Sequence, residues 1–123
     1  MKLTTAEEQL MEIIWDKTEL YMKDIIDHYD EPKPATTTIA TLLKRMQDKN
    51  FVGYKLTGNS RLYYALVKKE DYFSKHVNGL IKNFFGNSAM QFASFFTRET
   101  NLTADELENL KRIIDQEIDK KKP

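Results

Sequence analysis

The spacing of the hydrophobic residues changes at Asn50, and this change restricts the fold more than any other feature of the chain. Over residues 35–49, hydrophobic side chains recur three and four positions apart, which is the spacing of one buried face on an α-helix. These side chains are Ile39, Leu42, Leu43 and Met46. After Asn50, hydrophobic residues occupy every second position, which is typical of a β-strand. The sequence therefore predicts a helix over 35–49 followed by β-structure.

Both ends of this predicted helix have suitable residues. Pro34 fits just before or at the first helical position, because its missing N–H would have no partner there. A threonine from the run that follows can cap the start of the helix. Asn50 tolerates the left-handed conformation that often ends a helix. We therefore expect a well-bounded helix with one buried and one exposed face.

The exposed face of the predicted helix carries hydroxyl groups and cations. It comprises Thr37, Thr38, Thr41, Lys44, Arg45 and Lys49, with Asp48 as its one acid. Hydroxyl groups and arginine at the front of an exposed helix can contact phosphates and base edges in the major groove of DNA. A charged outer face is also common on helices that only face solvent. The flanking elements are therefore needed to distinguish a DNA-binding helix from a solvated one.

Three further elements complete the N-terminal half. Thr4 with Glu7 fits a capping box at the start of a first helix, and Thr5 with Glu8 fits one almost as well. This helix runs through Trp15, which we expect in the core. A short second helix is predicted over 22–29. After the third helix, two alternating stretches surround a Gly-Asn-Ser turn at 58–60, which predicts a β-hairpin. One hairpin face, with Leu62, Tyr64 and Leu66 in its second strand, is expected to pack on the helices, and the other to expose Lys55, Arg61 and Tyr63.

Helix, helix, helix and hairpin within about 65 residues is the arrangement of a winged helix-turn-helix. From Lys69 the pattern is helical again, with interruptions at 86–88 and before a second capping box at Thr103 and Glu106. The predicted fold is mainly α with a small β-hairpin wing. It comprises an N-terminal winged helix-turn-helix domain over 1–68 and a C-terminal three-helix dimerisation domain over 69–123.

The C-terminal helices have more apolar surface than so small a domain can bury on itself. At about 25 cal/mol per Å², leaving several phenylalanine and leucine side chains in water costs several kcal/mol. A second copy related by a two-fold axis removes that cost, so we expect a tight homodimer through residues 70–119. The expected dimerisation residues are Phe73, Val77, Leu80, Ile81, Phe84, Phe85, Phe92, Phe95, Phe96, Leu107, Leu110 and Ile114.

Composition excludes several classes of function. The chain has no cysteine, so it has no disulfide, thiolate metal site or cysteine nucleophile. The histidines, His28 and His76, lie far apart, and neither a glycine-rich phosphate loop nor a serine nucleophile motif is present. We therefore expect neither an enzyme nor a metal or cofactor site. Without a membrane-length apolar run or a signal peptide, a cytoplasmic protein with no membrane insertion is expected.

The charge distribution favours an anionic partner on one side of the molecule. The formal net charge is zero, but residues 7–31 contain nine acids and two bases, whereas residues 33–61 contain six bases and one acid. An alternative is a winged helix that only docks proteins, without specific DNA binding. That use does not require the five cations gathered on the third helix and the wing. They are Lys44, Arg45, Lys49, Lys55 and Arg61.

The segment Thr37–Met46 resembles the recognition-helix signature Thr-Thr-Val-x-Thr-Leu-Leu-x-Arg-Leu of the penicillinase repressor family of transcriptional regulators. Weaker, collinear similarities occur in the first helix (Leu3–Glu7), the last wing strand (Tyr63–Val67), the junction Phe84–Asn87 and the final helix (Leu102–Leu110). The resemblance implies a dimeric repressor on double-stranded DNA with a palindromic operator. It also implies that Thr37, Thr38, Thr41 and Arg45 face the DNA.

Three departures from the family pattern affect regulation. Some members are inactivated by proteolysis at an Asn-Phe bond, whereas the nearest match here is Ser94-Phe95-Phe96. The copper-responsive members carry a C-terminal Cys-x-Cys array that this chain lacks, and the wing arginine is displaced to Arg61. An upstream protease or sensor is thus left unidentified.

The complete predicted DNA-binding set is Thr36, Thr37, Thr38, Thr41, Lys44, Arg45, Lys49, Lys55, Arg61 and Tyr63.

Overall fold

The computed structural model describes residues 2–123 and divides the chain into two compact units. The first unit ends at His76, and the second begins at Val77. The division falls inside a helix, α4 (Lys69–Phe84), whose first turns therefore belong to the first unit.

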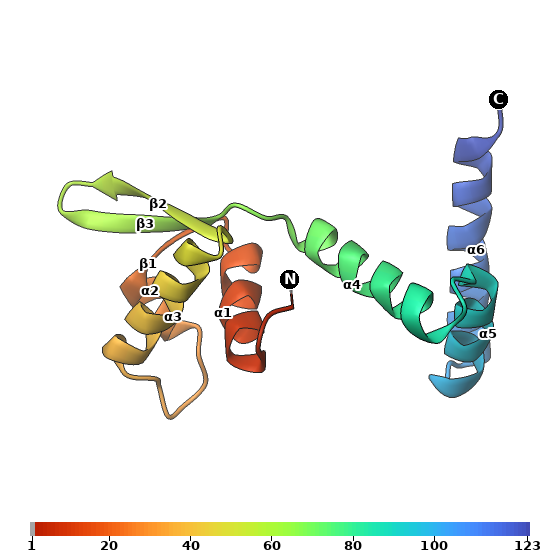
Figure 1. The fold of residues 1–123 in the computed structure, drawn as a ribbon, viewed down its shortest axis with the longest axis horizontal. Coiled ribbons are helices and arrows are strands. Elements are labelled where there is room, and N and C mark those ends of the chain that lie inside the picture. Colours follow the sequence, from red (N-terminus) through yellow and green to blue (C-terminus); the bar gives the residue numbers. More distant parts are fainter. Residues whose placement is uncertain (1) are drawn as a thin grey trace. The chain divides into compact units, whose positions relative to one another are not determined.

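The first unit contains three helices and a small antiparallel sheet (Figure 1). In chain order the elements are α1 (Thr5–Asp16), β1 (Glu19–Tyr21), α2 (Met22–Asp27), α3 (Thr36–Asp48), β2 (Val52–Thr57) and β3 (Ser60–Ala65). The predicted helix-turn-helix of α2 and α3, followed by a β2–β3 wing, is confirmed. The core between them is made by one face of each helix and the base of the sheet, and its largest fully buried side chains include Leu10, Met11, Ile14, Ile25, Ile39, Leu43 and Met46.

Helix α1 begins as its sequence predicts. The Thr4 hydroxyl oxygen accepts a hydrogen bond from the Glu7 N–H at 3.2 Å, and the Glu7 carboxylate accepts one from the Thr4 N–H at 2.8 Å. This reciprocal capping box satisfies two donors that a helix start leaves free. Trp15, near the other end of α1, packs on the core and donates its indole N–H to the Val67 carbonyl at 2.8 Å.

Helix α3 ends as predicted but begins differently. Its N-cap is Ala35, which has no side chain able to cap, so the expected threonine cap is wrong. At the other end Asn50 has φ 63°, and the Phe51 N–H donates to the Met46 carbonyl at 2.8 Å. The Asn50 N–H donates to Gln47 at 3.0 Å, which completes a Schellman motif.

Strand β1 was not predicted from the sequence. It pairs antiparallel with β3, from Glu19 opposite Tyr64 to Tyr21 opposite Leu62, and gives the sheet order β1-β3-β2. Three residues are too few to display a two-residue period, so the sequence carries no signal for this strand.

The predicted inward face of the second wing strand is wrong. Tyr63 is buried, with 4% of its surface exposed, and it lies opposite Tyr54 in the register. Arg61 lies opposite Leu56, so both Arg61 and Tyr63 share the face of Val52 and Tyr54. Residues 62–66 are all apolar or aromatic, so either alternation fits them. A shift of one residue exchanges the two faces of a strand, and the turn with Gly58 at φ 64° sets the observed register.

The second unit consists of the end of α4, α5 (Ala89–Glu99) and α6 (Ala104–Lys121). Gly86 and Asn87, with φ of 58° and 59°, separate α4 from α5, and Thr103 caps α6 in the predicted capping box with Glu106. The Phe92 and Phe96 rings stack on each other, and the Phe85 ring packs edge-on against Phe92 and tilted against Phe95. Even so, neither α5 nor α6 has a fully buried residue within the described chain.

Candidate nucleic-acid interface

The exposed face of α3 presents the side chains that the sequence singled out. Ile39, Leu42, Leu43 and Met46 anchor the opposite face in the core, so the outward face is held in one orientation. Its exposed residues include Thr36, Thr37, Thr38, Thr41, Lys44 and Arg45. The structure thus brings six of the predicted residues together on one helix face.

The polar groups on this face are available for an outside partner. The Thr41 hydroxyl donates to the Thr37 carbonyl at 2.9 Å, which leaves its oxygen lone pairs and its methyl group facing solvent. Lys44 pairs with Asp48 at 3.3 Å, but both side chains are largely exposed. An exposed pair of this kind contributes little to stability, so a stronger anion can displace Asp48.

The wing contributes two further cations. Lys55 pairs with Glu19 of β1 at 3.0 Å, again between exposed side chains. The Arg61 guanidinium lies 4.2 Å from the centre of the Tyr54 ring, a cation–π contact that orients it. Within residues 2–123 it makes no hydrogen bond or ion pair, so its N–H groups can donate to an outside partner. Tyr63 of β3, in contrast, is buried and belongs to the core.

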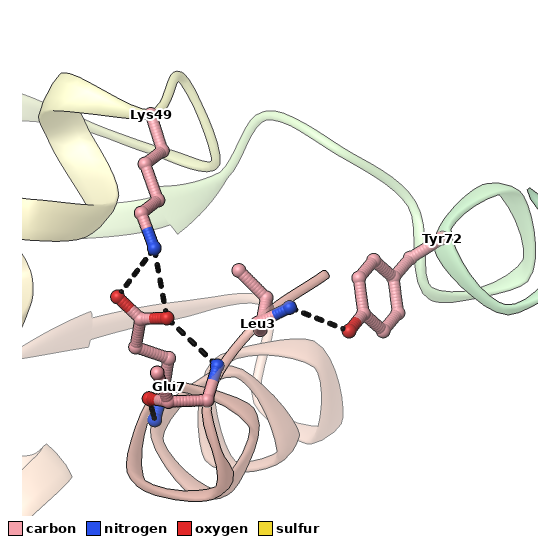
Figure 2. A network of polar contacts seen from close by, with 5 residues as sticks. Leu3, Glu7, Lys49 and Tyr72 are labelled. Carbon is pink, nitrogen blue, oxygen red and sulfur yellow. Dashed lines mark hydrogen bonds and ion pairs between the residues drawn. The ribbon is translucent and has the colours of Figure 1, made fainter. Parts of the chain in front are cut away.

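Lys49 is engaged inside the protein. Its ammonium group contacts both carboxylate oxygens of Glu7, at 2.9 and 2.8 Å, and Glu7 is fully buried (Figure 2). Burial by itself raises the pKa of Glu7, but the hydrogen bonds from Lys49 and from the Thr4 N–H outweigh it, so the pKa lies below its usual value. The structure therefore gives Lys49 a structural ion pair that holds the end of α3 on the start of α1.

A groove of about 710 Å³ separates α3 from the wing and reaches the start of α2. Lys44 of α3 and Arg61 of the wing line it together with Lys23 of α2. Sequence reasoning missed Lys23, because it falls in the acidic part of the chain, and also the wing-turn residues Asn59 and Ser60 on the groove wall. Asp24 also lines the groove, and its carboxylate accepts a hydrogen bond from the Tyr21 N–H at 3.2 Å. Three cations against one acid favour an anionic occupant.

The histidines stay separate: the His28 ring nitrogen Nδ1 lies 2.6 Å from the Asp24 carbonyl oxygen, and the His76 ring packs on Tyr72. Among residues 2–123, no group of three or more His, Cys, Asp and Glu side chains could hold a metal ion. Over the same residues, no helix is long and apolar enough to cross a membrane.

Several predicted dimerisation residues are exposed in the single chain. The set includes Val77, Leu80, Phe84, Phe95, Phe96, Leu107 and Ile114. Met90, Ile113 and Ile118, which were not in the predicted set, are exposed as well. Phe73 is 37% exposed, but its ring also packs on Trp15 and Tyr72 within the first unit.

Comparison with known proteins gives consistent matches over nearly the whole chain. The sequence model of the family described as "Penicillinase repressor" matches residues 3–116. The methicillin resistance regulatory protein MecI of Staphylococcus aureus is 28% identical over 116 residues, which are 94% of each chain. The penicillinase repressor of Bacillus licheniformis is 20% identical over 122 residues, 98% of this chain and 95% of that protein. Among solved structures, a mutant of MarR from E. coli aligns with a TM-score of 0.49 and 16% identity, covering 95% of this chain and 79% of that one.

Proposed function

The chain belongs to the penicillinase repressor family, and we propose that it acts as a homodimeric transcriptional repressor that inserts α3 into the major groove of a palindromic operator. The observation that carries this proposal is the exposed face of α3. This face carries hydroxyl groups and the exposed Arg45, and the opposite face of the helix is fixed in the core. Such a protein acts where the chromosome is, which in a bacterium is the cytoplasm.

Base recognition is assigned to the front and middle of α3. The methyl groups of Thr37, Thr38 and Thr41 can contact thymine methyl groups, and their hydroxyls can reach base edges or phosphates. Arg45 can bind a guanine in bidentate fashion or a phosphate. Thr36, at the first helical position, completes this set.

The cations around the groove are assigned to the DNA backbone. When α3 occupies a major groove and the wing lies against the neighbouring backbone, the groove-lining cations Lys44, Arg61 and Lys23 can contact phosphate groups. Lys55 extends this positive edge along the wing. We do not assign a DNA contact to Lys49, because it is paired with Glu7, or to Tyr63, because it is buried.

The second unit is assigned to dimerisation. Its exposed side chains include Phe84, Met90 and Ile113, and a second copy would remove them from water. A two-fold dimer presents two copies of α3, which matches the symmetry of a palindromic site. Phe73 is not part of this interface in our proposal, since it packs in the first unit.

Binding to DNA selected from a randomised duplex pool tests the proposal. The selected sequence should bind with nanomolar affinity and at least about a hundredfold more tightly than scrambled DNA, and affinity should fall steeply with salt. The control variant Glu108→Ala, on the exposed surface of α6, should bind both DNAs as the wild-type chain does. Equal, weak binding to selected and scrambled DNA would instead favour the protein-docking alternative.

A further inference from the structure

One side chain, Tyr72, ties the first turn of α4 to the start of α1. Its hydroxyl accepts a hydrogen bond from the Leu3 N–H at 3.0 Å (Figure 2) and donates one to the Glu8 carboxylate at 2.9 Å. Tyr72 is 4% exposed, and Leu3 is equally buried. The bond from Leu3 is buried, and the bond to Glu8 is partly buried. A hydrogen bond that is shielded from water is stronger, and its loss is more costly.

The ring of Tyr72 also contacts the segment that ends α3. It packs edge-on against Phe51, with centroids 5.8 Å apart, and Phe51 closes the Schellman motif of α3. The centroid of the Trp15 ring of α1 also lies 5.8 Å from that of Tyr72. Glu7, the neighbour of Glu8, holds Lys49 at the same end of α3. Tyr72 therefore connects α4 both to the start of α1 and to Phe51, the two places where the orientation of α3 is fixed.

Other side chains in the first turns of α4 are held less firmly. Lys69 pairs with Glu12 at 3.1 Å, but both side chains are about half exposed, so this pair contributes little. Phe73 packs on Trp15 but remains partly exposed. Among the described residues of this turn, Tyr72 alone combines burial with hydrogen bonds to another element.

We propose that Tyr72 is a positioning residue that sets which spacing between two operator half-sites the dimer accepts. Helix α4 continues past His76 into the second unit, so the polypeptide connection between DNA reader and dimerisation unit runs through it. Anchoring its first turn restricts the directions in which a dimer can present its two α3 helices. This inference rests on the proposed dimeric DNA binding and names the residue that gives it geometric selectivity.

The first experiment measures spacing selectivity with the full-length chain. Wild type, Tyr72→Phe and the control Tyr29→Phe are titrated with the selected operator and with versions carrying one or two base pairs added or removed between half-sites. The control removes a hydroxyl that has no hydrogen-bond partner among residues 2–123. For each operator with an altered spacing, wild type and control should bind about tenfold or more weakly than they bind the selected operator. Tyr72→Phe should bind such an operator only about threefold more weakly.

A purely structural role would lower the affinity of Tyr72→Phe equally for every spacing. An unchanged spacing profile in this variant would therefore overturn the inference while leaving the proposed function intact. Should Tyr72→Phe fold poorly, Glu8→Ala removes one of the two hydrogen bonds and leaves the Leu3 bond in place. It should show a weaker relaxation of the same profile, and an unchanged profile there overturns the inference as well.

A second experiment reads the geometry without DNA. Because the chain has no cysteine, Asp48→Cys provides a single spin-label site on the exposed end of α3. Electron–electron dipolar spectroscopy of the dimer should give a narrower distance distribution with Tyr72 than with Tyr72→Phe. Equal widths would overturn the inference alone. An absence of dipolar coupling in the wild-type background would mean that the chain does not dimerise, which overturns the proposed function and the inference together.

Discussion

The two units of this chain use their hydrophobic residues in different ways. The first unit buries them: α1, α2, α3 and the sheet share a core whose central side chains are inaccessible to water. The second unit leaves them at its surface, where Phe84 is 76% exposed and α5 and α6 have no buried residue among those described. A unit of fewer than 50 residues seldom buries enough apolar area to be stable alone. From this contrast we expect the first unit to keep its structure by itself and the second to need a partner surface.

The largest effect is expected from breaking the second unit's surface. Phe84→Asp places a charge where we propose a dimer interface, so the dimer should dissociate at micromolar concentration and operator affinity should fall about a hundredfold or more, because the two half-sites no longer act together. Sedimentation velocity and fluorescence anisotropy measure the two changes. Glu108→Ala provides the control. A variant that is monomeric yet binds the operator as tightly as wild type would show that the two-fold arrangement is wrong.

Substitution on the exposed face of α3 should change binding without unfolding the first unit. Arg45→Ala should weaken operator binding by about 1–3 kcal/mol if a base contact is lost, while the thermal midpoint stays unchanged, since Arg45 is exposed. Arg45→Lys separates the two roles: a phosphate contact tolerates lysine, whereas bidentate guanine recognition does not. Lys122→Ala removes an equal charge at the far end of α6, and a loss of affinity as large as that of Arg45→Ala would refute the assignment.

The buried ion pair should govern the stability of the first unit and its response to pH. Glu7→Gln should lower the free energy of unfolding at pH 7 by about 2 kcal/mol, less than for a fully buried pair, because Lys49 is 28% exposed. The pKa of Glu7 is lower in the folded chain than its ordinary value of 4.5. Its contribution is therefore complete above pH 4.5 and is lost as the pH falls through the folded-state pKa.

Urea unfolding of wild type and Glu7→Gln at pH 7 and at acidic pH measures this difference. The gap between the two proteins should narrow as the solution is acidified. Glu19→Gln, which breaks the exposed pair with Lys55, is the matched control and should cost less than about 1 kcal/mol. If both variants lose the same small amount at pH 7, the Glu7–Lys49 pair does not stabilise the first unit.

Much of the fold could be predicted from the sequence, because local signals set it. The capping boxes at Thr4 and Thr103, the left-handed Asn50 and the change of hydrophobic period each depend on neighbouring residues only. Where the signal was ambiguous the prediction failed. The apolar stretch 62–66 fits either strand face, and the three-residue β1 shows no period.

The candidate site could be predicted less completely, for a related physical reason. A helical period places Lys44, Arg45 and Lys49 outside the buried stripe, but it carries no information on which long side chain reaches a distant partner. Glu7 lies 42 positions before Lys49, and the two meet only after folding. The groove residue Lys23 was likewise missed, because it reaches the site through the packing of α2 beside the wing.

The smallest expected effect distinguishes Lys44 of α3 from Lys49, the residue that follows the end of α3. Lys44 is exposed and only weakly paired, so Lys44→Ala should lower the slope of log affinity against log salt concentration by about one unit and leave stability unchanged. Lys49→Ala should do the opposite: it leaves Glu7 buried without its cation and so lowers stability, but the salt slope should stay as in wild type. Anisotropy titrations across a salt series, paired with urea unfolding, measure both quantities. A reduced slope for Lys49→Ala at unchanged stability would return Lys49 to the DNA-contacting set and would mean that Glu7 releases it when DNA binds.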